Sequence, residues 1–394
     1  MNRRQLLALS AALPLAAAYG RLYAVPSAPG KLLVVFLRGG YDATNFLIPV
    51  ASEFYYEARP NIAIRRPGSA PNAALALDAN WALHPSLRET IYPMFLQGQV
   101  AFVPFCGTDD LTRSHFETQD SLELGQPLEG SRDFQSGFLN RLTDVLRGRQ
   151  PIAFTEQLPL ILRGDKDVPN MALRSLGKPG IDSRQSAIIA GMYQRTALAS
   201  PVKQGFGLRD EVMHAMEPEM EAANRGAITA KGFELEARRI ATLMAEKFDI
   251  GFVDVGGWDT HVGEGGATGY LAGRLDELGR GLCAIAREMG ARWPETVLVV
   301  ISEFGRTFRE NGNRGTDHGH GSVYWVMGGA IKGGRIAGDQ VDLTPATLFQ
   351  NRDYPVLNDY RAVFAGLFAR MYSLNSTQLS QVFPKASAKE IGLL

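Results

Sequence analysis

The most hydrophobic stretches of the chain are five short runs, and a glycine or a polar turn follows each of them. They are Lys31–Leu37, Val100–Phe105, Ile250–Val255, Val297–Ile301 and Val323–Met327. Continuous apolar runs of this length are typical of strands buried on both faces of a parallel sheet. Two shorter segments, Ile152–Phe154 and Leu158–Leu162, are predicted to be further short strands.

Segments with helical spacing of apolar residues separate these runs. Phe233–Glu246 and Tyr270–Met289 are predicted helices, and another is predicted to follow Asp359 as far as Tyr372. We also expect a helix that opens at 81–87 and ends near Gln97. Strands that alternate with helices through glycine turns indicate a parallel sheet covered by helices.

This alternation predicts one α/β domain over residues 25–394, and nothing repeats at a fixed period. The stretch 165–225 differs from the rest because it is polar, with scattered glycines and prolines. It contains helical segments such as Ser186–Arg195. We interpret it as a cap or an insertion in the domain.

Residues 1–24 have the pattern of a signal peptide rather than of a folded segment. Arg3 and Arg4 precede an apolar stretch, Leu6–Ala18, and Ala24 is a small residue that could precede a cleavage site. A charged start, a short apolar core and a small-residue exit are typical of secretion, and adjacent arginines favour the twin-arginine route. The alternative, an uncleaved anchor helix, is disfavoured because the apolar stretch is short for a bilayer. We therefore expect a periplasmic or extracellular protein.

Composition places the chain among ordinary globular proteins and excludes several classes of partner. Hydrophobic residues make up 45% and charged residues 21%, and the formal net charge is zero. Nothing in this balance suggests nucleic-acid binding or a polybasic membrane contact, and no later segment reaches transmembrane length. The two cysteines, Cys106 and Cys283, are expected to be unpaired. The oligomeric state is left open.

Carboxylates and imidazoles follow the ends of the predicted strands. Each has an ordinary structural interpretation, since an aspartate in a turn is usually a cap. Together, however, they place several ionisable groups at one edge of one sheet, where ligands of open α/β sheets bind. The candidate metal ligands are Asp42, Asp259, His261, Glu303, Asp317, His318 and His320. This number of ligands suits a pair of ions better than one tetrahedral ion.

Mixed carboxylate and imidazole ligands point to a divalent metal. Zinc is the first choice, and manganese, magnesium or calcium are alternatives where more oxygen ligands bind. Two ions held a few ångströms apart can stabilise both the attacking and the leaving oxygen in phosphoryl or sulfuryl transfer.

A second group of residues has the chemistry of catalysis. Ser114 and His115 lie in the first turn of a predicted helix that follows the strand at 100–105. A hydroxyl there faces free backbone N–H groups, which favour an oxyanion, although a serine at this position is also a common helix cap. His115 could orient this nucleophile or bind metal. Arg38 and Arg306 could hold substrate oxygens through a bidentate fork.

Five segments carry a resemblance to a known family. RGGYD (38–42), RSHFE (113–117), GGWDTH (256–261), SEFGRT (302–307) and DHGHG (317–321) occur in this order. They resemble the secreted bacterial family called domain of unknown function 1501, within the alkaline-phosphatase-like, or sulfatase-like, superfamily. The resemblance covers nearly the whole chain after the signal segment. It implies a three-layer α/β/α domain with a mainly parallel sheet and a metal centre at the carboxyl edge of that sheet.

The resemblance also implies roles for individual residues. Asp42 matches the first metal aspartate of the superfamily, and Ser114, or else Thr112, matches the hydroxyl nucleophile. The remaining matches are Asp259 with His261 as an Asp/His ligand motif, Glu303 as the strand-end carboxylate, and His318 or His320 as the late histidine. The chain departs from the superfamily where Glu303-Phe304 replaces the usual Asp-His pair, and the Cys/Ser-x-Pro-x-Arg motif of sulfatases is absent around Ser114.

These observations lead to two hypotheses about function. The first is a metal-dependent hydrolase of phosphate or sulfate esters, with Ser114 as nucleophile and a small-molecule or polymer ester as substrate. The second is a non-catalytic, metal-stabilised binding or assembly protein of the same fold. Phe304, which stands in place of a histidine, is the residue that favours the second hypothesis.

The twin-arginine assignment predicts the outcome of a simple export experiment. Arg3→Lys with Arg4→Lys should leave the precursor in the cytoplasm, because the twin-arginine pathway recognises that pair. Cell fractionation measures the result, and the same change at Arg65 and Arg66 is the matched control. Normal export of the first variant would contradict this route but not secretion as such.

Overall fold

The structure is a computed structural model that describes residues 30–173, 183–208 and 232–394. The predicted signal peptide, 1–24, lies outside the described residues, and so does part of the predicted cap.

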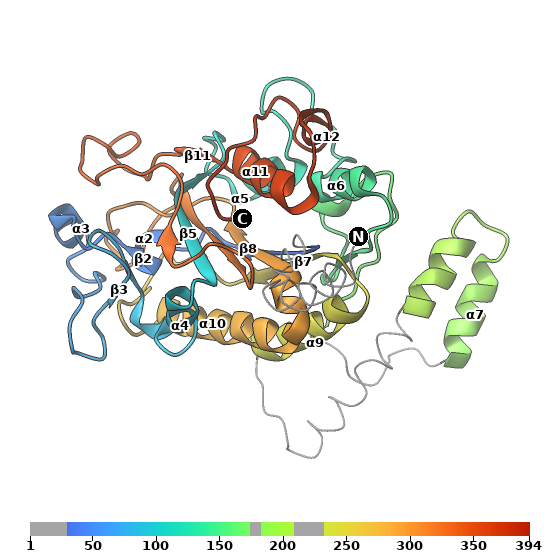
Figure 1. Cartoon of the computed structure of the whole chain (residues 1–394), viewed down its shortest axis with the longest axis horizontal. Coiled ribbons are helices and arrows are strands. Elements are labelled where there is room, and N and C mark those ends of the chain that lie inside the picture. The colour runs from blue at the N-terminus through green and yellow to red at the C-terminus, as the bar shows by residue number, and fades with distance from the viewer. Residues whose placement is uncertain (1–29, 174–182, 209–231) are drawn as a thin grey trace, which may run out of the picture.

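A sheet of eight strands forms the centre of the domain (Figure 1). Its strands follow the spatial order β10-β5-β9-β8-β1-β7-β6, and β11 also pairs with β5. Their bounds are β1 Lys31–Arg38, β5 Val100–Gly107, β6 Pro151–Ala153, β7 Ile250–Gly256, β8 Thr296–Ser302, β9 Ser322–Gly328, β10 Arg335–Ile336 and β11 Asn358–Asp359.

All pairings in this sheet are parallel except the two that β9 makes, with β8 and with β5. The prediction of a mainly parallel sheet is therefore confirmed. The direction of β9 also has a consequence for the site. The chain leaves the carboxyl end of β8, forms the 303–321 loop, and returns at the same edge, so both ends of that loop lie there.

Helices cover both faces of the sheet, which confirms the three-layer α/β/α class (Figure 1). One face is covered by α4 Ile91–Leu96, α9 Phe233–Glu246 and α10 Tyr270–Met289, and the other by α5 His115–Leu124, α6 Phe138–Leu146, α11 Tyr360–Tyr372 and α12 Ser376–Val382. The remaining named α-helices are α2 Ala43–Phe46, α3 Glu53–Ala58 and α7 Ser183–Tyr193, and α7 stands apart from the main body. A small antiparallel sheet joins β2 Leu47–Ile48, β3 Leu75–Ala76 and β4 Ala82–Leu83.

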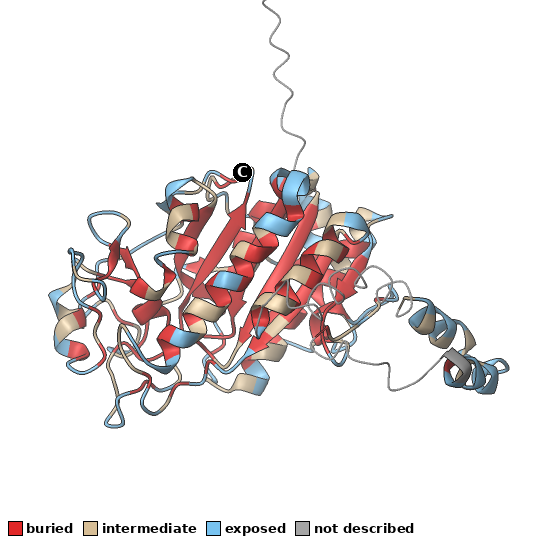
Figure 2. Cartoon of the chain, turned by 90° about the horizontal axis from the view of Figure 1, so that it is seen from below, coloured by how far each residue is buried: buried red, intermediate tan, exposed pale blue. Residues whose placement is uncertain are grey.

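The apolar residues of the central strands explain why both faces are covered. Along β1, Leu33, Val35 and Leu37 belong to the core beneath α9 and α10, whereas Val34 and Phe36 belong to the core on the opposite face. A strand that is apolar on both faces has to be covered on both. Figure 2 shows the result, with buried strands between helices that turn their exposed sides outward.

Two sequence-based predictions of local structure are wrong. Leu158–Leu162 is not a strand but contains a single 3-10 turn, Leu160–Leu162, which starts after Pro159. The helix expected over 81–97 is divided into β4, a 3-10 turn at Pro85–Leu87, and the short α4. His84 starts the 3-10 turn, because its side chain accepts a hydrogen bond from the backbone N–H of Ser86. The backbone of Thr90, with ψ −88°, then separates that turn from α4.

Two expectations about the rest of the chain can be compared with the structure. Cys106 and Cys283 are both free, as expected. Within the described residues, no helix is long and apolar enough to cross a membrane.

His84 generates a prediction about stability and pH. Burial lowers the pKa of its imidazole to about 4, from 6.5. Between these values the unfolded chain binds a proton that the folded protein does not bind, so stability is lost as the pH falls from 6.5 towards 4. The full effect is about 3 kcal/mol. Urea unfolding across this range should show a smaller loss for His84→Asn, which keeps an acceptor for the backbone N–H of Ser86. Identical pH dependence in both proteins would contradict this account.

Candidate metal centre

Four segments of the chain bring polar groups to the carboxyl edge of the sheet. The turn 39–42 follows β1, the segment 257–261 follows β7, and the loop 303–321 follows β8. The fourth segment is the start of α5, whose first residue is His115. Since β1, β5, β7 and β8 all run in the same direction, their following residues meet at one edge.

Asp259 lies at the centre of three imidazoles. Its Oδ1 is 2.9 Å from Nε2 of His261, 3.4 Å from Nε2 of His318 and 3.5 Å from Nε2 of His115. We call these four residues the histidine cluster. One ligand atom from each of His115, Asp259 and His318 lies within 4.8 Å of the others. Four ligands around tetrahedral zinc are about 3.3 Å apart, so the spacing in the cluster fits a metal ion.

The other nitrogen of each ring fixes its orientation. Nδ1 of His115 is 2.8 Å from Oε1 of Glu303, Nδ1 of His261 is 3.2 Å from Oδ1 of Asp317, and Nδ1 of His318 is 2.8 Å from the carbonyl oxygen of Arg113. These oxygens are acceptors, so each Nδ1 is the donor and a neutral ring has its lone pair at Nε2. An acceptor behind each ligand nitrogen is the arrangement that metal-binding histidines have.

Two further observations show that the residues present fit a cation. Nε2 of His115 is buried and has no hydrogen-bond partner among the described residues. In addition, Asp259, Glu303 and Asp317 contribute three carboxylates, and within the described part of the chain the one guanidinium in contact with them is that of Arg306. With neutral imidazoles, two negative charges remain, which a divalent ion would neutralise.

Arg306, which we predicted to hold substrate oxygens, holds the cluster from behind in this structure. Its side chain is fully buried and forms an ion pair with Asp259. Its remaining donors reach backbone carbonyls of the neighbouring segments, those of Gly39, Gly40, Trp258 and Thr316. The guanidinium is therefore already bound by protein groups and cannot present a free fork to a ligand.

Glu303 also lies behind the cluster. Its Oε1 accepts hydrogen bonds from the backbone N–H of Gly39 and from Nε2 of Gln119, both at 2.8 Å, besides the one from His115. Its Oε2 accepts from Ser302. The carboxylate is completely buried and saturated by these donors, so the structure places it as the partner of His115 rather than beside the Nε2 atoms.

The electrostatics keep the carboxylates charged and His318 neutral. Burial alone would raise the pKa of Asp259, but the hydrogen bond and charge of Arg306 lower it below its ordinary value. Burial alone would also raise the pKa of Glu303. The hydrogen bonds from His115 and Gln119 outweigh this effect, so the pKa of Glu303 is lowered. The hydrogen bond with Glu303 raises the pKa of His115, whereas burial lowers the pKa of His318.

Phe304 packs against two of the rings, which also contact each other with 4.3 Å between their centroids. Its ring centroid is 4.9 Å from that of His115 and 5.0 Å from that of His318. Gly40 supports it from the other side, with φ +60° and with no room for a Cβ atom, which would lie 2.4 Å from Cε2 of Phe304. Phe304, which stands where the family resemblance leads us to expect a histidine, thus serves as an apolar support for both imidazoles.

Arg113 has a strained backbone at the site. Its φ of 53° is unusual for a residue with a side chain. In this conformation its carbonyl oxygen receives the Nδ1 proton of His318, while its guanidinium binds Asp353 at 2.7 Å. Strain of this kind persists where surrounding contacts impose it, and it is common at functional sites.

Asp42 and His320 are not brought into the histidine cluster. Asp42 is fully buried, caps α2 and forms an ion pair with Arg59, which is equally buried. The ring of His320 packs on Phe349, at 4.8 Å between centroids. Asp317 is close to the cluster but acts through Nδ1 of His261. Of the seven candidate ligands, Asp259, His261 and His318 therefore face one point. His115, which was not among the seven, completes the histidine cluster.

The hydroxyl groups at α5 differ in how firmly they are held. Ser114 caps the helix and accepts a long hydrogen bond, 3.5 Å, from the backbone N–H of Glu117. The hydroxyl of Thr112 instead donates to Oδ1 of Asp110 at 2.7 Å. Of the two, Ser114 has the less committed oxygen and directly precedes His115.

Arg38 is engaged in the same way as Arg306, although it stays partly exposed. It bonds Asp254 at 2.7 Å, Glu123 at 2.9 Å and Gln119 at 2.8 Å. Gln119 in turn bonds Glu303, so Arg38 supports His115 through two intermediate side chains. Sequence reasoning missed Gln119, whose place one turn after His115 on α5 was the available signal.

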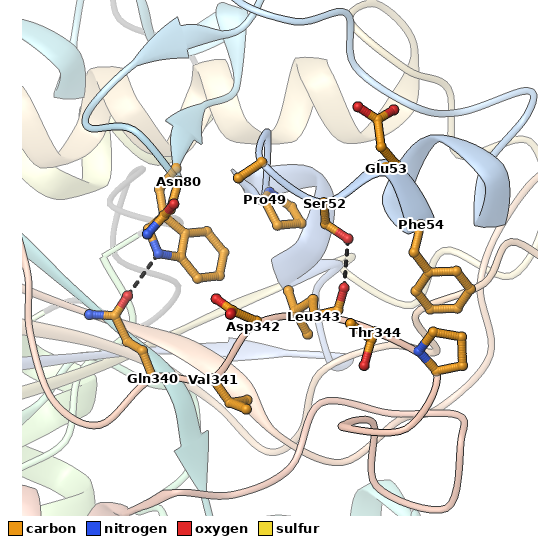
Figure 3. A pocket seen from close by; sticks show the side chains of 13 residues that line it. Pro49, Ser52, Glu53, Phe54, Asn80, Gln340, Val341, Asp342, Leu343 and Thr344 are labelled. Carbon is orange, nitrogen blue, oxygen red and sulfur yellow. Dashed lines mark hydrogen bonds between the residues drawn. The ribbon is translucent and has the colours of Figure 1, made fainter.

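Two cavities of the described structure are not lined by any member of the histidine cluster. A cavity of about 670 Å³, shown in Figure 3, lies between the loop at 340–345 and the start of α3 and contains no cluster residue. A second cavity, of about 460 Å³, is lined by Arg38, Asp254 and Gly256, which precede the two turns of the site.

The contact between Gly40 and Phe304 generates a prediction with a matched control. Gly40→Ala and Gly98→Ala both place a Cβ atom at positive φ, but Gly98 has open space around it. Gly40→Ala should therefore lower the free energy of unfolding by about 1–3 kcal/mol more than Gly98→Ala, because Phe304 has to move. Urea denaturation measures both values, and equal losses would contradict the described packing.

Solved structures with a similar fold share little sequence with this chain. A crystal structure of Ps i-CgsB in complex with k-i-k-neocarrahexaose has 9% identity and a TM-score of 0.38, and the match covers 92% of this chain and 75% of that one. A protein in the alkaline phosphatase superfamily from Vibrio parahaemolyticus has 13% identity and a TM-score of 0.36, with 84% and 71% covered.

Sequence comparison gives a more definite result. No curated protein matches the chain. The model of one family, described as "Protein of unknown function (DUF1501)", matches residues 30–383 and so covers most of the sequence. The family resemblance inferred from the five motifs is thereby confirmed, and the chain belongs to the DUF1501 family.

Proposed function

We propose that the protein is a metal-dependent hydrolase of phosphate or sulfate esters, acting in the periplasm or outside the cell. One observation carries this proposal: three imidazole Nε2 atoms converge on Oδ1 of Asp259, at 2.9–3.5 Å, with an acceptor behind each ring. The fold supports it, because the cluster lies at the edge where α/β proteins bind their ligands.

The donor set favours one ion, and zinc in particular. His115, His261, His318 and Asp259 would hold it through three nitrogens and one oxygen, a set that zinc accepts readily and that manganese can use. Magnesium and calcium prefer oxygen ligands and suit this cluster less well. The placement of Asp42 and His320 in other contacts argues for a single ion in place of the pair expected from the ligand count.

The residues behind the cluster would prepare it for chemistry. A bound divalent ion would supply a Lewis acid that stabilises negative charge on ester oxygens. Glu303, Asp317 and the carbonyl of Arg113 hold the three rings, and Arg306 holds Asp259, so the ligands need little rearrangement. Preorganised groups of this kind lower the cost of reaching the transition state.

Ser114 is the proposed nucleophile. Its Oγ would form a bond to phosphorus or sulfur while the bond to the leaving alcohol breaks, and water would later release the inorganic product. The hydroxyl lies at the start of α5, where free N–H groups and the helix dipole stabilise an oxyanion. A cavity of about 460 Å³, lined by Arg38, Asp254 and Gly256, would offer room for the alcohol part of the ester, whether small molecule or polymer.

The alternative is a metal-stabilised binding or assembly protein without turnover. A specific observation favours it: the guanidinium groups of Arg38 and Arg306 are committed to protein acceptors, so neither is free to hold an anionic ester. Both hypotheses require the metal. They differ in that the hydrolase would turn over an ester and the binding protein would not.

Metal analysis and ester hydrolysis test the proposal together. Protein purified without chelators should contain about one divalent ion per chain and should hydrolyse 4-nitrophenyl phosphate or sulfate. Removal of the ion with EDTA should lower the melting temperature and abolish turnover. His318→Ala should lose the metal by direct removal of one ligand. No stoichiometric metal, or an unchanged melting temperature after chelation, would contradict the metal centre.

The role of Ser114 needs variants that separate catalysis from helix capping. Ser114→Ala removes both the hydroxyl and the cap, whereas Ser114→Asn removes the hydroxyl and keeps a good cap. Both should retain the metal and lose turnover by a factor of about 100 or more, as expected for a nucleophile. Normal turnover in Ser114→Asn would exclude this nucleophile, and metal binding without turnover in the wild type would favour the binding protein.

A further inference from the structure

Two loops carry most of the histidine cluster, and they are joined backbone to backbone. The loop 259–264 contains Asp259 and His261, and the loop 311–318 contains His318. Three N–H···O bonds of 3.0 Å connect them, from the N–H groups of Gly263, Glu264 and Thr316 to the carbonyl groups of residues 313, 314 and 260. The relative position of these cluster residues therefore depends on how firmly the two loops hold each other.

Glu264 connects the same loops through its side chain. Its Oε2 accepts a hydrogen bond from the hydroxyl of Thr260 at 2.8 Å and another from the hydroxyl of Thr316 at 3.0 Å. Thr260 stands between Asp259 and His261, and Thr316 stands two residues before His318. One oxygen thus bridges the two loops directly behind the residues that face the ion.

The carboxyl group of Glu264 has no exposure and is held on its other side as well. Its Oε1 is 3.3 Å from Nδ2 of Asn45, and it forms a hydrogen bond with Asp42. Asp42 is paired with Arg59, which also bonds the carbonyl groups of Thr307 and Phe308. Burial and the neighbouring Asp42 raise the pKa of Glu264 well above its ordinary value. The raised pKa favours the protonated form of Glu264, which with Arg59 would neutralise this pair of carboxyl groups.

We propose that Glu264 is a positioning residue of the metal centre, which holds the two ligand loops at the spacing that the ion requires by bridging Thr260 and Thr316. The proposal rests on the metal centre proposed above. Glu264 does not touch the cluster, and its effect passes through the two hydroxyl groups and the backbone next to Asp259, His261 and His318.

The size of the effect follows from the geometry. Groups that orient metal ligands typically change metal affinity by 10–100-fold when they are removed. Glu264 contacts the neighbours of the proposed ligands rather than the ligands themselves, but it acts on both loops at once. We therefore expect its removal to weaken metal binding by about 10-fold. The protonated carboxyl group presents one acceptor to the hydroxyls and one donor to Asp42. An amide reproduces both and loses only the long contact, 3.3 Å, with Nδ2 of Asn45. Glu264→Gln should therefore bind metal nearly as well as wild type, and Glu264→Leu should not.

The experiment compares zinc and cobalt binding to chelator-treated full-length proteins, well below the melting temperature of every variant. Wild type and Glu264→Gln should give similar dissociation constants and similar visible spectra with cobalt. Glu264→Leu should bind about 10-fold more weakly and give an altered cobalt spectrum, because the ligand geometry changes. Asn140→Leu is the control, since Asn140 is a buried residue whose side chain bonds Leu162 and Lys166 in the opposite core.

A purely structural role for Glu264 would lower stability without changing affinity. If Glu264→Leu binds metal as tightly as Asn140→Leu, the positioning role is wrong.

Should Glu264→Leu fail to fold, Thr260→Val and Thr316→Val each remove one of the two hydrogen bonds to Glu264 and keep the shape of the side chain. Each should weaken binding in part, and the double variant should weaken it further; unchanged affinity in both would overturn the proposal. Absence of binding in wild type would overturn the metal centre itself.

Discussion

The ion pair between Arg306 and Asp259 is the contact on which the carboxyl edge of the sheet depends. The guanidinium is completely buried, so it is stable there only because its donors are bound. It joins the turn after β1, the segment after β7 and the loop after β8 through one side chain. Loss of Arg306 would leave Asp259 facing three imidazoles without a counter-charge. The same contact leaves the guanidinium of Arg306 bound to protein groups.

A second buried ion pair, between Arg59 and Asp42, resembles the pair between Arg306 and Asp259 in its position in the fold. Both aspartates follow a central strand, and both are held by an arginine from a later segment. The two pairs differ in their neighbours. Asp259 is surrounded by imidazole nitrogens, whereas Asp42 shares its environment with Glu264 and Asn45. In the second pair the guanidinium and a proton already supply the positive charge. This difference favours the proposed single ion at Asp259.

Much of the fold could be predicted from the sequence because both faces of the sheet are covered. Runs such as Lys31–Leu37 and Val297–Ile301 identify strands within a residue or two, and Phe233–Glu246 and Tyr270–Met289 are helices with the predicted bounds. Prediction failed where single contacts decide the structure, as at Pro159 before its 3-10 turn.

The site was less predictable, since a position after a strand does not determine where a side chain points. Nothing in the irregular stretch around Arg59 signals that it pairs with Asp42, so the sequence could not separate Asp42 from the candidates that meet at Asp259. Nor could it show that Phe304 packs against both His115 and His318. These facts depend on packing between segments that lie far apart along the chain.

The most direct test of the account is a crystal structure of the zinc-loaded protein with an anomalous difference map recorded at the zinc edge. The account predicts one strong peak per chain, bonded to Nε2 of His115, His261 and His318 and to a carboxylate oxygen of Asp259, at about 2.0–2.2 Å. A peak at Asp42, two peaks of similar height, or an ion bound without the imidazoles would contradict it.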